Sequence, residues 1–134
     1  MLANITLICD DKMNCLLITK AKQNKNEVLS FLQSNRIEFD ITENQLIGIQ
    51  KAHEKVFDVV VLDAEESSGL IDRAIRILKE CNPNVRIIVR TDMNSRELEM
   101  LVRKESVFYY HVNSFGNQEF TSALGAALEL NRAH

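Results

Sequence analysis

The stretch Val59-Val60-Val61-Leu62-Asp63 decides the fold that this chain is expected to adopt. Four apolar residues, three of them β-branched, follow one another without a break and end at an aspartate. A run of this kind predicts a strand that is buried on both faces, at the centre of a parallel sheet. Ligands of open parallel sheets bind beyond the carboxyl ends of the strands. Asp63 is therefore a candidate functional carboxylate; the alternative is an aspartate that only ends a strand and begins a turn.

Segments typical of strands and of amphipathic helices alternate on both sides of this stretch. Between the strands, apolar residues recur at helical spacing, and Asn44 and Asn94 are candidate helix caps. Five strand-helix units in succession predict an α/β domain, in which helices cover both faces of a parallel sheet. The strands are predicted at 15–19, 38–42, 59–63, 85–90 and 107–112.

The composition of the chain is typical of one globular domain. Its 134 residues are 46% hydrophobic and 26% charged, which is sufficient for a core of its own. A net charge of −3 gives no basic surface for nucleic acid, and no apolar run is long enough to cross a membrane. Three cysteines without a CxxC motif are best explained as reduced thiols, which favours a cytoplasmic location.

The first fourteen residues are predicted to form an extension, 1–14, that precedes the main domain, 15–134. Ile5–Cys9 has the pattern of a short strand, and Asp10 and Asp11 follow it in a polar, turn-like segment. We expect this extra strand to pair antiparallel with the first core strand or to extend a dimer interface.

Three stretches of the chain resemble the response-regulator receiver domain, the CheY-like phosphoacceptor module of bacterial two-component signalling. They are Glu43–Asp63, Asn82–Thr91 and Tyr109–Phe115, and the resemblance runs from about Cys15 to Leu130. It implies a flavodoxin-like, doubly wound sheet of strand order 2-1-3-4-5. It also places Asp63 at the phosphoacceptor position, Thr91 and Asn113 in the switch pocket, and Tyr110 at the aromatic switch position.

The chain departs from the receiver pattern where the family's chemistry would require specific residues. Ile18 and Thr19, followed by Lys20, stand where receivers have the acidic pair that holds magnesium. Asn113 replaces the family's lysine, and Ser114 replaces the proline after it. We therefore expect a degenerate receiver, or pseudo-receiver, without a bound metal or an enzymatic activity. It would act in a phosphorelay through protein–protein contacts rather than through efficient phosphorylation of Asp63.

Two alternatives remain open at the level of the sequence. If Ile5–Cys9 were the first core strand, Asp10 and Asp11 would be the acidic pair, Mg²⁺ would bind, and Asp63 would be a working phosphoacceptor. That register leaves a segment too long for the first helix. The second alternative is a phosphotransfer enzyme with Cys9 as its nucleophile, although the loop after Cys9 lacks the glycine and hydroxyl residues that hold a phosphate.

The expected partner is a protein, either a histidine kinase or another signalling protein, and not a nucleic acid or a membrane. The resemblance implies a contact face made of the fourth helix, the fifth strand and the fifth helix, through which a homodimer is also possible. Tyr110 is predicted to be central to that face, with Arg103 at its rim. His111 is predicted to be packed or at an edge, and Arg86 and Arg90 to be strand-end or outward-facing charges. The sequence leaves open whether the domain stands alone or belongs to a longer protein.

Overall fold

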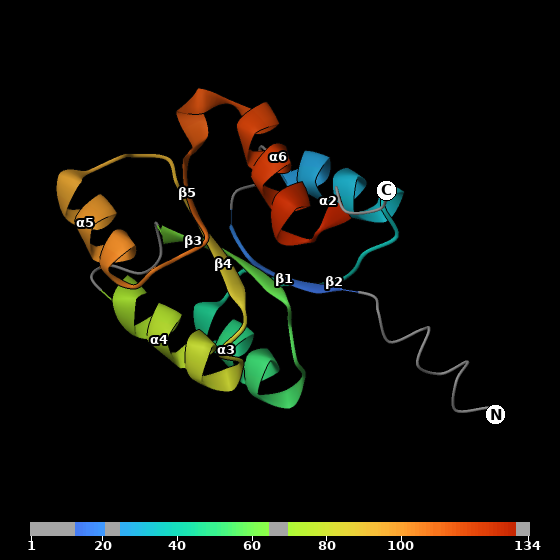
Figure 1. The fold of residues 1–134 in the computed structure, drawn as a ribbon, viewed down its shortest axis with the longest axis horizontal. Coiled ribbons are helices and arrows are strands. Elements are labelled where there is room, and N and C mark those ends of the chain that lie inside the picture. Colours follow the sequence, from blue (N-terminus) through green and yellow to red (C-terminus); the bar gives the residue numbers. More distant parts are fainter. Residues whose placement is uncertain (1–12, 21–24, 65–69, 131–134) are drawn as a thin grey trace.

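The computed structural model describes residues 13–20, 25–64 and 70–130, and these form one α/β layer structure (Figure 1). All five strands are parallel, in the order β2-β1-β3-β4-β5. The predicted fold class and strand order are therefore confirmed. The strands are β1 (Asn14–Ile18), β2 (Glu38–Thr42), β3 (Val59–Asp63), β4 (Arg86–Thr91) and β5 (Tyr109–Val112).

The helices cover both faces of this sheet. Among the helices of the described residues, three pack on one face and two on the other (Figure 1). None of the helices in the described part of the chain combines the length and the apolar character needed to cross a bilayer. The first face carries α3 (Gln45–Glu54), α4 (Ile71–Cys81) and α5 (Arg96–Lys104); the second carries α2 (Lys25–Ser34) and α6 (Asn117–Ala127), and a short 3-10 turn, η2 (Asn113–Phe115), joins β5 to α6.

The central strand β3 is buried along its whole length, as its unbroken apolar run predicted. Its side chains alternate between two hydrophobic clusters, because successive residues of a strand point to opposite faces. Val60 and Leu62 pack in the cluster beneath α3, α4 and α5. Val59 and Val61 pack in the cluster beneath α2 and α6.

The first strand of the sheet is β1, in the register that the preferred interpretation of the sequence expected. It lies between β2 and β3, and Ile18 is opposite Leu62. Partners on both sides leave β1 no free edge, so the expected antiparallel pairing of Ile5–Cys9 with this strand is wrong. Residues 5–9, like Asp10 and Asp11, lie outside the described residues.

The helix starts follow the predicted capping pattern in one case and differ in another. The side chain of Asn44 accepts a hydrogen bond from the Ile47 amide at 3.1 Å and caps α3 as expected. The cap of α5 is Ser95, which accepts from the Leu98 amide at 3.0 Å, and not the predicted Asn94. Asn94 instead accepts a hydrogen bond from the hydroxyl of Tyr110 at 2.8 Å, so its side chain is used to tie a loop to β5.

Gly48 brings α3 close to the carboxyl end of β1. A Cβ atom at this position would lie 2.5 Å from the Cδ1 atom of Ile18, which is closer than two carbon atoms can pack. The absence of a side chain therefore lets α3 pack closely against Ile18, the last residue of β1.

Candidate functional site

Three polar side chains meet at the carboxyl edge of the sheet, one from the end of each central strand. In the strand register, Asp63 is opposite Arg90, and Thr19 follows the Ile18 that is opposite Leu62. The Nε of Arg90 donates to Oδ1 of Asp63 at 2.9 Å, and its Nη2 lies 3.5 Å from Oδ2. The same Nη2 donates to the Thr19 hydroxyl at 3.0 Å, and that hydroxyl donates in turn to Oδ2 of Asp63. The three groups form a closed network.

This network is almost completely removed from solvent. Asp63, Arg90 and Thr19 are 6%, 2% and 3% exposed. A buried carboxylate or guanidinium is costly unless an opposite charge and hydrogen bonds compensate for the lost hydration. Arg90 supplies both to Asp63, so the carboxylate has its counter-charge within the protein.

Arg90 was predicted to be a strand-end or an outward-facing charge; it lies near the end of β4, but it is buried, so the outward-facing alternative is wrong. Two residues before it, Ile88 packs in the cluster beneath α2 and α6, and alternation along β4 sends Arg90 to the same face. On β3, Val61 packs in the same cluster, so alternation sends Asp63, two residues later, to this face as well. The buried position of Arg90 was not predicted, because its charge suggested exposure. Period-two alternation along the strand was the signal that identifies it.

An aromatic side chain from α6 covers the ion pair. The ring of Phe120 lies 4.8 Å from the centre of the Arg90 guanidinium, within range of a cation–π interaction. On β5, the imidazole of His111 lies 5.5 Å from the same ring, and Tyr109 stacks on His111 at 6.1 Å. In the interior of the protein, Phe120 therefore contacts both the guanidinium of Arg90 and the titratable imidazole of His111.

His111 is packed, as the sequence predicted, and its surroundings favour the neutral imidazole. The side chain is buried, and its Nδ1 atom has no hydrogen-bond partner among the described residues. Burial lowers the pKa of His111 below its ordinary value, and the positive charge of Arg90 lowers it further. Glu119 and a hydrogen bond with the Gly116 backbone act in the opposite direction but do not reverse the shift.

Acidification should therefore destabilise this protein through His111. Above a pH of about 6.5 the imidazole is neutral in both the folded and the unfolded chain and contributes no pH dependence. As the pH falls below that value, the unfolded chain takes up a proton that the folded protein refuses, so the free energy of unfolding decreases until the lowered pKa is reached. Urea unfolding between about pH 7.5 and about pH 5.5 measures this slope.

A pair of variants tests whether His111 causes this dependence of the free energy of unfolding on pH. His111→Phe keeps an aromatic ring between Tyr109 and Phe120 and removes the titration, so it should flatten the dependence on pH. The matched control is His53→Gln, since His53 is exposed. An unchanged slope in His111→Phe would show that other groups cause the pH dependence.

The other predicted pocket residues, Thr91, Asn113 and Tyr110, are grouped around the loop between β4 and α5. The Thr91 hydroxyl accepts from the Met93 amide at 3.2 Å and donates to the Met93 carbonyl at 3.0 Å. The Asn113 amide donates to Asp92 at 2.7 Å. Together with the bond from Tyr110 to Asn94, these contacts link β5 and the loop 92–95. Thr91 ends β4 and Asn113 directly follows β5, as expected, while Tyr110 lies within β5; the hydrogen bonds described here for all three serve this loop.

The described residues near Asp63 do not fit the magnesium ion that receivers bind. Ile18 is buried and apolar, and Thr19 offers one hydroxyl that is already bonded to Asp63 and Arg90. Magnesium requires oxygen ligands, usually with a second carboxylate, and the guanidinium of Arg90 places a cation beside the only carboxylate in this network. The described part of the chain contains no group of three His, Cys, Asp or Glu side chains arranged to hold a metal.

The strand order, with a carboxylate at the end of the central strand, defines the architecture of response-regulator receiver domains. Solved structures of such proteins are among those similar to this chain. One is HP1043, an orphan response regulator of H. pylori, with 20% identity, a TM-score of 0.72, and coverage of 87% of this chain and 96% of that one. Another is a CheY-like receiver domain protein from Methanospirillum hungatei JF-1, with 12% identity, a TM-score of 0.77, and coverage of 90% and 97%.

A third neighbour is a two-component response regulator from Clostridium difficile, with 18% identity, a TM-score of 0.76, and coverage of 88% and 97%. No protein-family model matches the sequence, and no curated protein matches it. At identities this low the structural likeness establishes the fold, and the function has to be argued from the residues of this chain.

Proposed function

We propose that this protein is a receiver-like signalling module of a two-component system, in which a permanent ion pair with Arg90 replaces phosphorylation of Asp63. The observation that carries the proposal is the buried contact of 2.9 Å between Arg90 Nε and Asp63 Oδ1. A phosphoacceptor aspartate must present a free oxygen to the phosphodonor, and it needs cations placed to neutralise the transferred group. Both oxygens of Asp63 are instead engaged by Arg90 and Thr19.

The substitutions around Asp63 support the same proposal. The resemblance to receivers places Thr19 at the position of an acidic metal ligand and Asn113 at the position of the cationic lysine. An amide carries no charge, and Asn113 bonds to Asp92. Arg90 carries a positive charge of the kind that a phosphoryl group would require, but it is already paired with the carboxylate of Asp63. The module would therefore act without Mg²⁺ and without catalysis.

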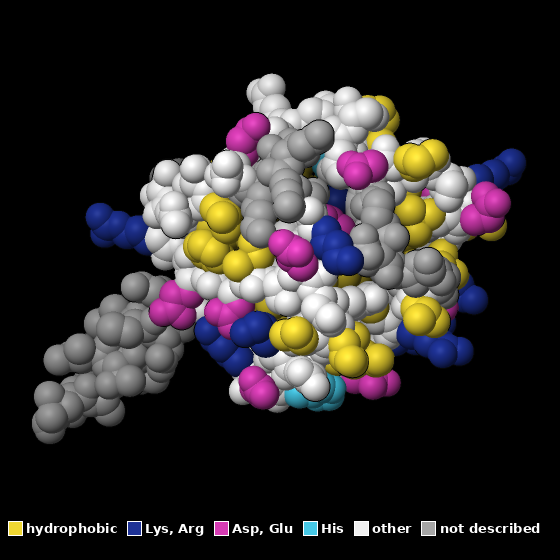
Figure 2. Space-filling model, turned by 180° about the vertical axis from the view of Figure 1, so that it is seen from behind, with side chains coloured by type: hydrophobic (Ala, Val, Ile, Leu, Met, Phe, Trp, Pro, Cys, Tyr) yellow, Lys and Arg dark blue, Asp and Glu magenta, His cyan; other side chains and the backbone are white. Residues whose placement is uncertain are grey.

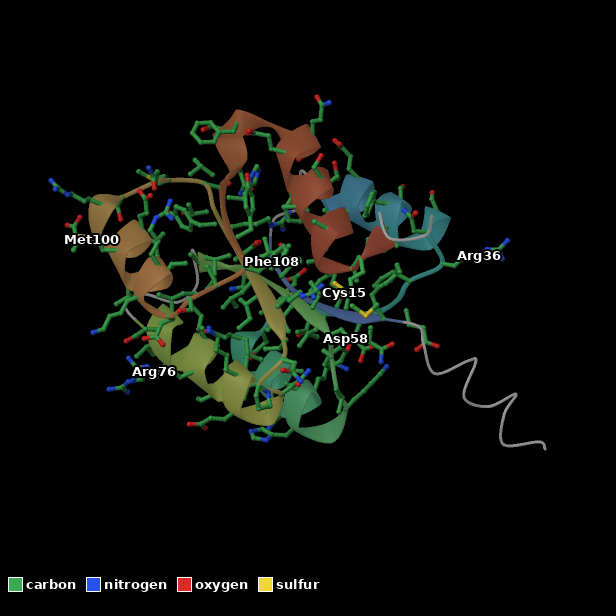
Figure 3. The ribbon with its side chains drawn as sticks, viewed as in Figure 1. Cys15, Arg36, Asp58, Arg76, Met100 and Phe108 are labelled. Carbon is green, nitrogen blue, oxygen red and sulfur yellow. The ribbon has the colours of Figure 1, made fainter. Side chains whose placement is uncertain are left out.

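The proposed mode of action is binding of a protein partner in the cytoplasm, a histidine kinase or another signalling protein. The proposed surface consists of α5, β5 and α6, and it is also a candidate for self-association. Met100, on the outer side of α5 (Figure 3), is 64% exposed, and Phe115 in η2 is 68% exposed. Tyr110 is half-buried and packs against the cluster beneath α5, so the exposed Met100 and Phe115 contribute more apolar surface to this face than Tyr110 does.

Phosphorylation with a small-molecule donor tests the proposal directly. We expect intact-protein mass spectrometry to find no phosphoryl adduct after incubation with acetyl phosphate and Mg²⁺, since Asp63 is occupied by Arg90. The triple variant Thr19→Asp, Arg90→Leu, Asn113→Lys restores the acidic ligand and the lysine and frees the carboxylate, and it should gain an adduct at Asp63. Adding Asp63→Asn to this variant is the control and should abolish the gain.

Two results would contradict the proposal. An adduct at Asp63 in the unaltered protein would make it a working phosphoacceptor and would revive the interpretation in which Asp10 and Asp11 bind the metal. An adduct at Cys9 would favour the phosphotransfer-enzyme alternative instead. Peptide mapping after digestion separates these cases, because the acyl phosphate and the thiophosphate lie on different peptides.

A further inference from the structure

A histidine and a cysteine meet at the carboxyl ends of two neighbouring helices, away from the site around Asp63. His53 is the last but one residue of α3, and Cys81 is the last residue of α4. The Sγ of Cys81 lies 3.5 Å from Nδ1 and 3.9 Å from Nε2 of the imidazole. The two residues are 28 positions apart in the sequence, so the packing of α3 against α4 brings them together (Figure 1).

Both side chains can be reached from the surface. His53 is exposed and Cys81 is half-buried. Figure 2 shows a histidine side chain at the molecular surface, with acidic side chains near it. Cys15 differs, because it is fully buried on β1 inside the molecule (Figure 3). Of the two cysteines in the described residues, only Cys81 is therefore available to a ligand from solution.

The separation of the two donor atoms matches that of neighbouring ligands on a zinc ion. Zn–S and Zn–N bonds of about 2.3 Å and about 2.1 Å, at a tetrahedral angle, place the sulfur and the nitrogen about 3.6 Å apart. The observed distance of 3.5 Å between Sγ and Nδ1 is close to this value. The location also favours a cation, because the carboxyl ends of helices carry partial negative charge and both donors lie in the last turn.

We propose that His53 and Cys81 form half of a zinc site, which the same pair from a second copy of this chain completes. Two ligands do not hold zinc firmly, and structural zinc sites have four. The described part of one chain offers no third His, Cys, Asp or Glu in position, so the site is incomplete without a partner. Two-fold symmetry would bring together two sulfurs and two nitrogens, which is the Cys₂His₂ set of structural zinc sites.

Zinc binding at this pair should depend on pH. Burial raises the pKa of the Cys81 thiol, and Glu80 raises it further. Zinc binds the thiolate, so each bound thiol must lose a proton, and the affinity should fall as the pH decreases. This inference concerns a different part of the surface from the face made of α5, β5 and α6 and does not depend on the proposed function.

Titration of the full chain with Co²⁺ and then Zn²⁺ tests the proposal. Cobalt bound by thiolate gives a charge-transfer absorption band, and we expect this band to saturate at one metal ion for two chains and to disappear when zinc displaces cobalt. Sedimentation velocity should show a dimer with Zn²⁺ and its loss with a chelator. Cys81→Ser and His53→Gln should each weaken zinc binding roughly tenfold or more and abolish the zinc-dependent dimer.

Cys9→Ser is the matched control, because Cys9 lies outside the described residues and is the other thiol that could bind metal. It should leave the cobalt band and the zinc-dependent dimer unchanged, and circular dichroism confirms that each variant is folded. The proposal is wrong if no saturable band forms, if Cys9→Ser removes it, or if zinc binds with the chain still a monomer. A dimer that persists in the chelator and in both site variants would belong to another surface.

Discussion

Replacing Arg90 by methionine should destabilise the protein by about 3–5 kcal/mol, the largest effect that we expect from a single charge. Methionine fills similar space but leaves the carboxylate of Asp63 buried without its counter-charge, and Asp63 is only 6% exposed. The Thr19 hydroxyl loses the donor that lies 3.0 Å away. Urea unfolding at neutral pH, followed by circular dichroism, measures the change in the free energy of unfolding.

Two further variants test whether the loss of stability in Arg90→Met comes from the buried ion pair. Arg103→Met removes an arginine whose side chain is 69% exposed and which pairs with Glu99 one turn away, so it should cost about 0.5 kcal/mol or less. The double variant Arg90→Met, Asp63→Leu removes both charges and should recover most of the lost stability, since a well-packed apolar pair can replace a buried ion pair. If the double variant is no more stable than Arg90→Met, the ion pair is not the cause of the loss.

Phe120→Ala should cost about 3–5 kcal/mol, because it empties a large buried volume between α6 and the sheet. The change also removes the ring that covers Arg90 at 4.8 Å and contacts His111 at 5.5 Å. Water would then reach the imidazole, so we expect the pKa of His111 to rise towards its ordinary value. Urea unfolding measures the first effect, and NMR titration of the histidine ring measures the second.

Phe115→Ala is the control for this prediction, because Phe115 is 68% exposed in η2, directly before α6. A surface substitution of this kind should change the free energy of unfolding by no more than about 0.5 kcal/mol. A loss of stability without any movement of the His111 pKa in Phe120→Ala would mean that Phe120 supports the core but does not shield the imidazole.

The fold was predictable because its signals are local and repeated. The apolar run of β3, the alternation of strands with helical patterns, and the proline after α4 each indicated the same architecture. The place of Asn44 as a cap was equally readable. The cap of α5 was not predictable in this way, because Asn94 and Ser95 are adjacent and both residue types cap helices. In the folded protein the Asn94 side chain bonds to Tyr110, and Ser95 is the cap.

The candidate site was predictable in its positions and not in its contacts. The sequence indicated that Thr19, Asp63, Thr91 and Asn113 lie at strand ends. It did not indicate that Arg90 neutralises Asp63, because this depends on three strand registers and on cover from Phe120 on a distant helix. Buried charges are rare, so a sequence gives an arginine little prior chance of lying in a core.

The guanidinium of Arg90 is a cation that binds the Asp63 carboxylate and is covalently part of the same chain. A free ion stabilises a protein in proportion to its occupancy, so its effect changes with concentration and with any chelator. A side chain on the adjacent strand is present at a fixed effective concentration and cannot dissociate from the chain. Under the function proposed above, the carboxyl edge of this sheet should therefore keep the same conformation at every magnesium concentration, and a partner would bind at another surface.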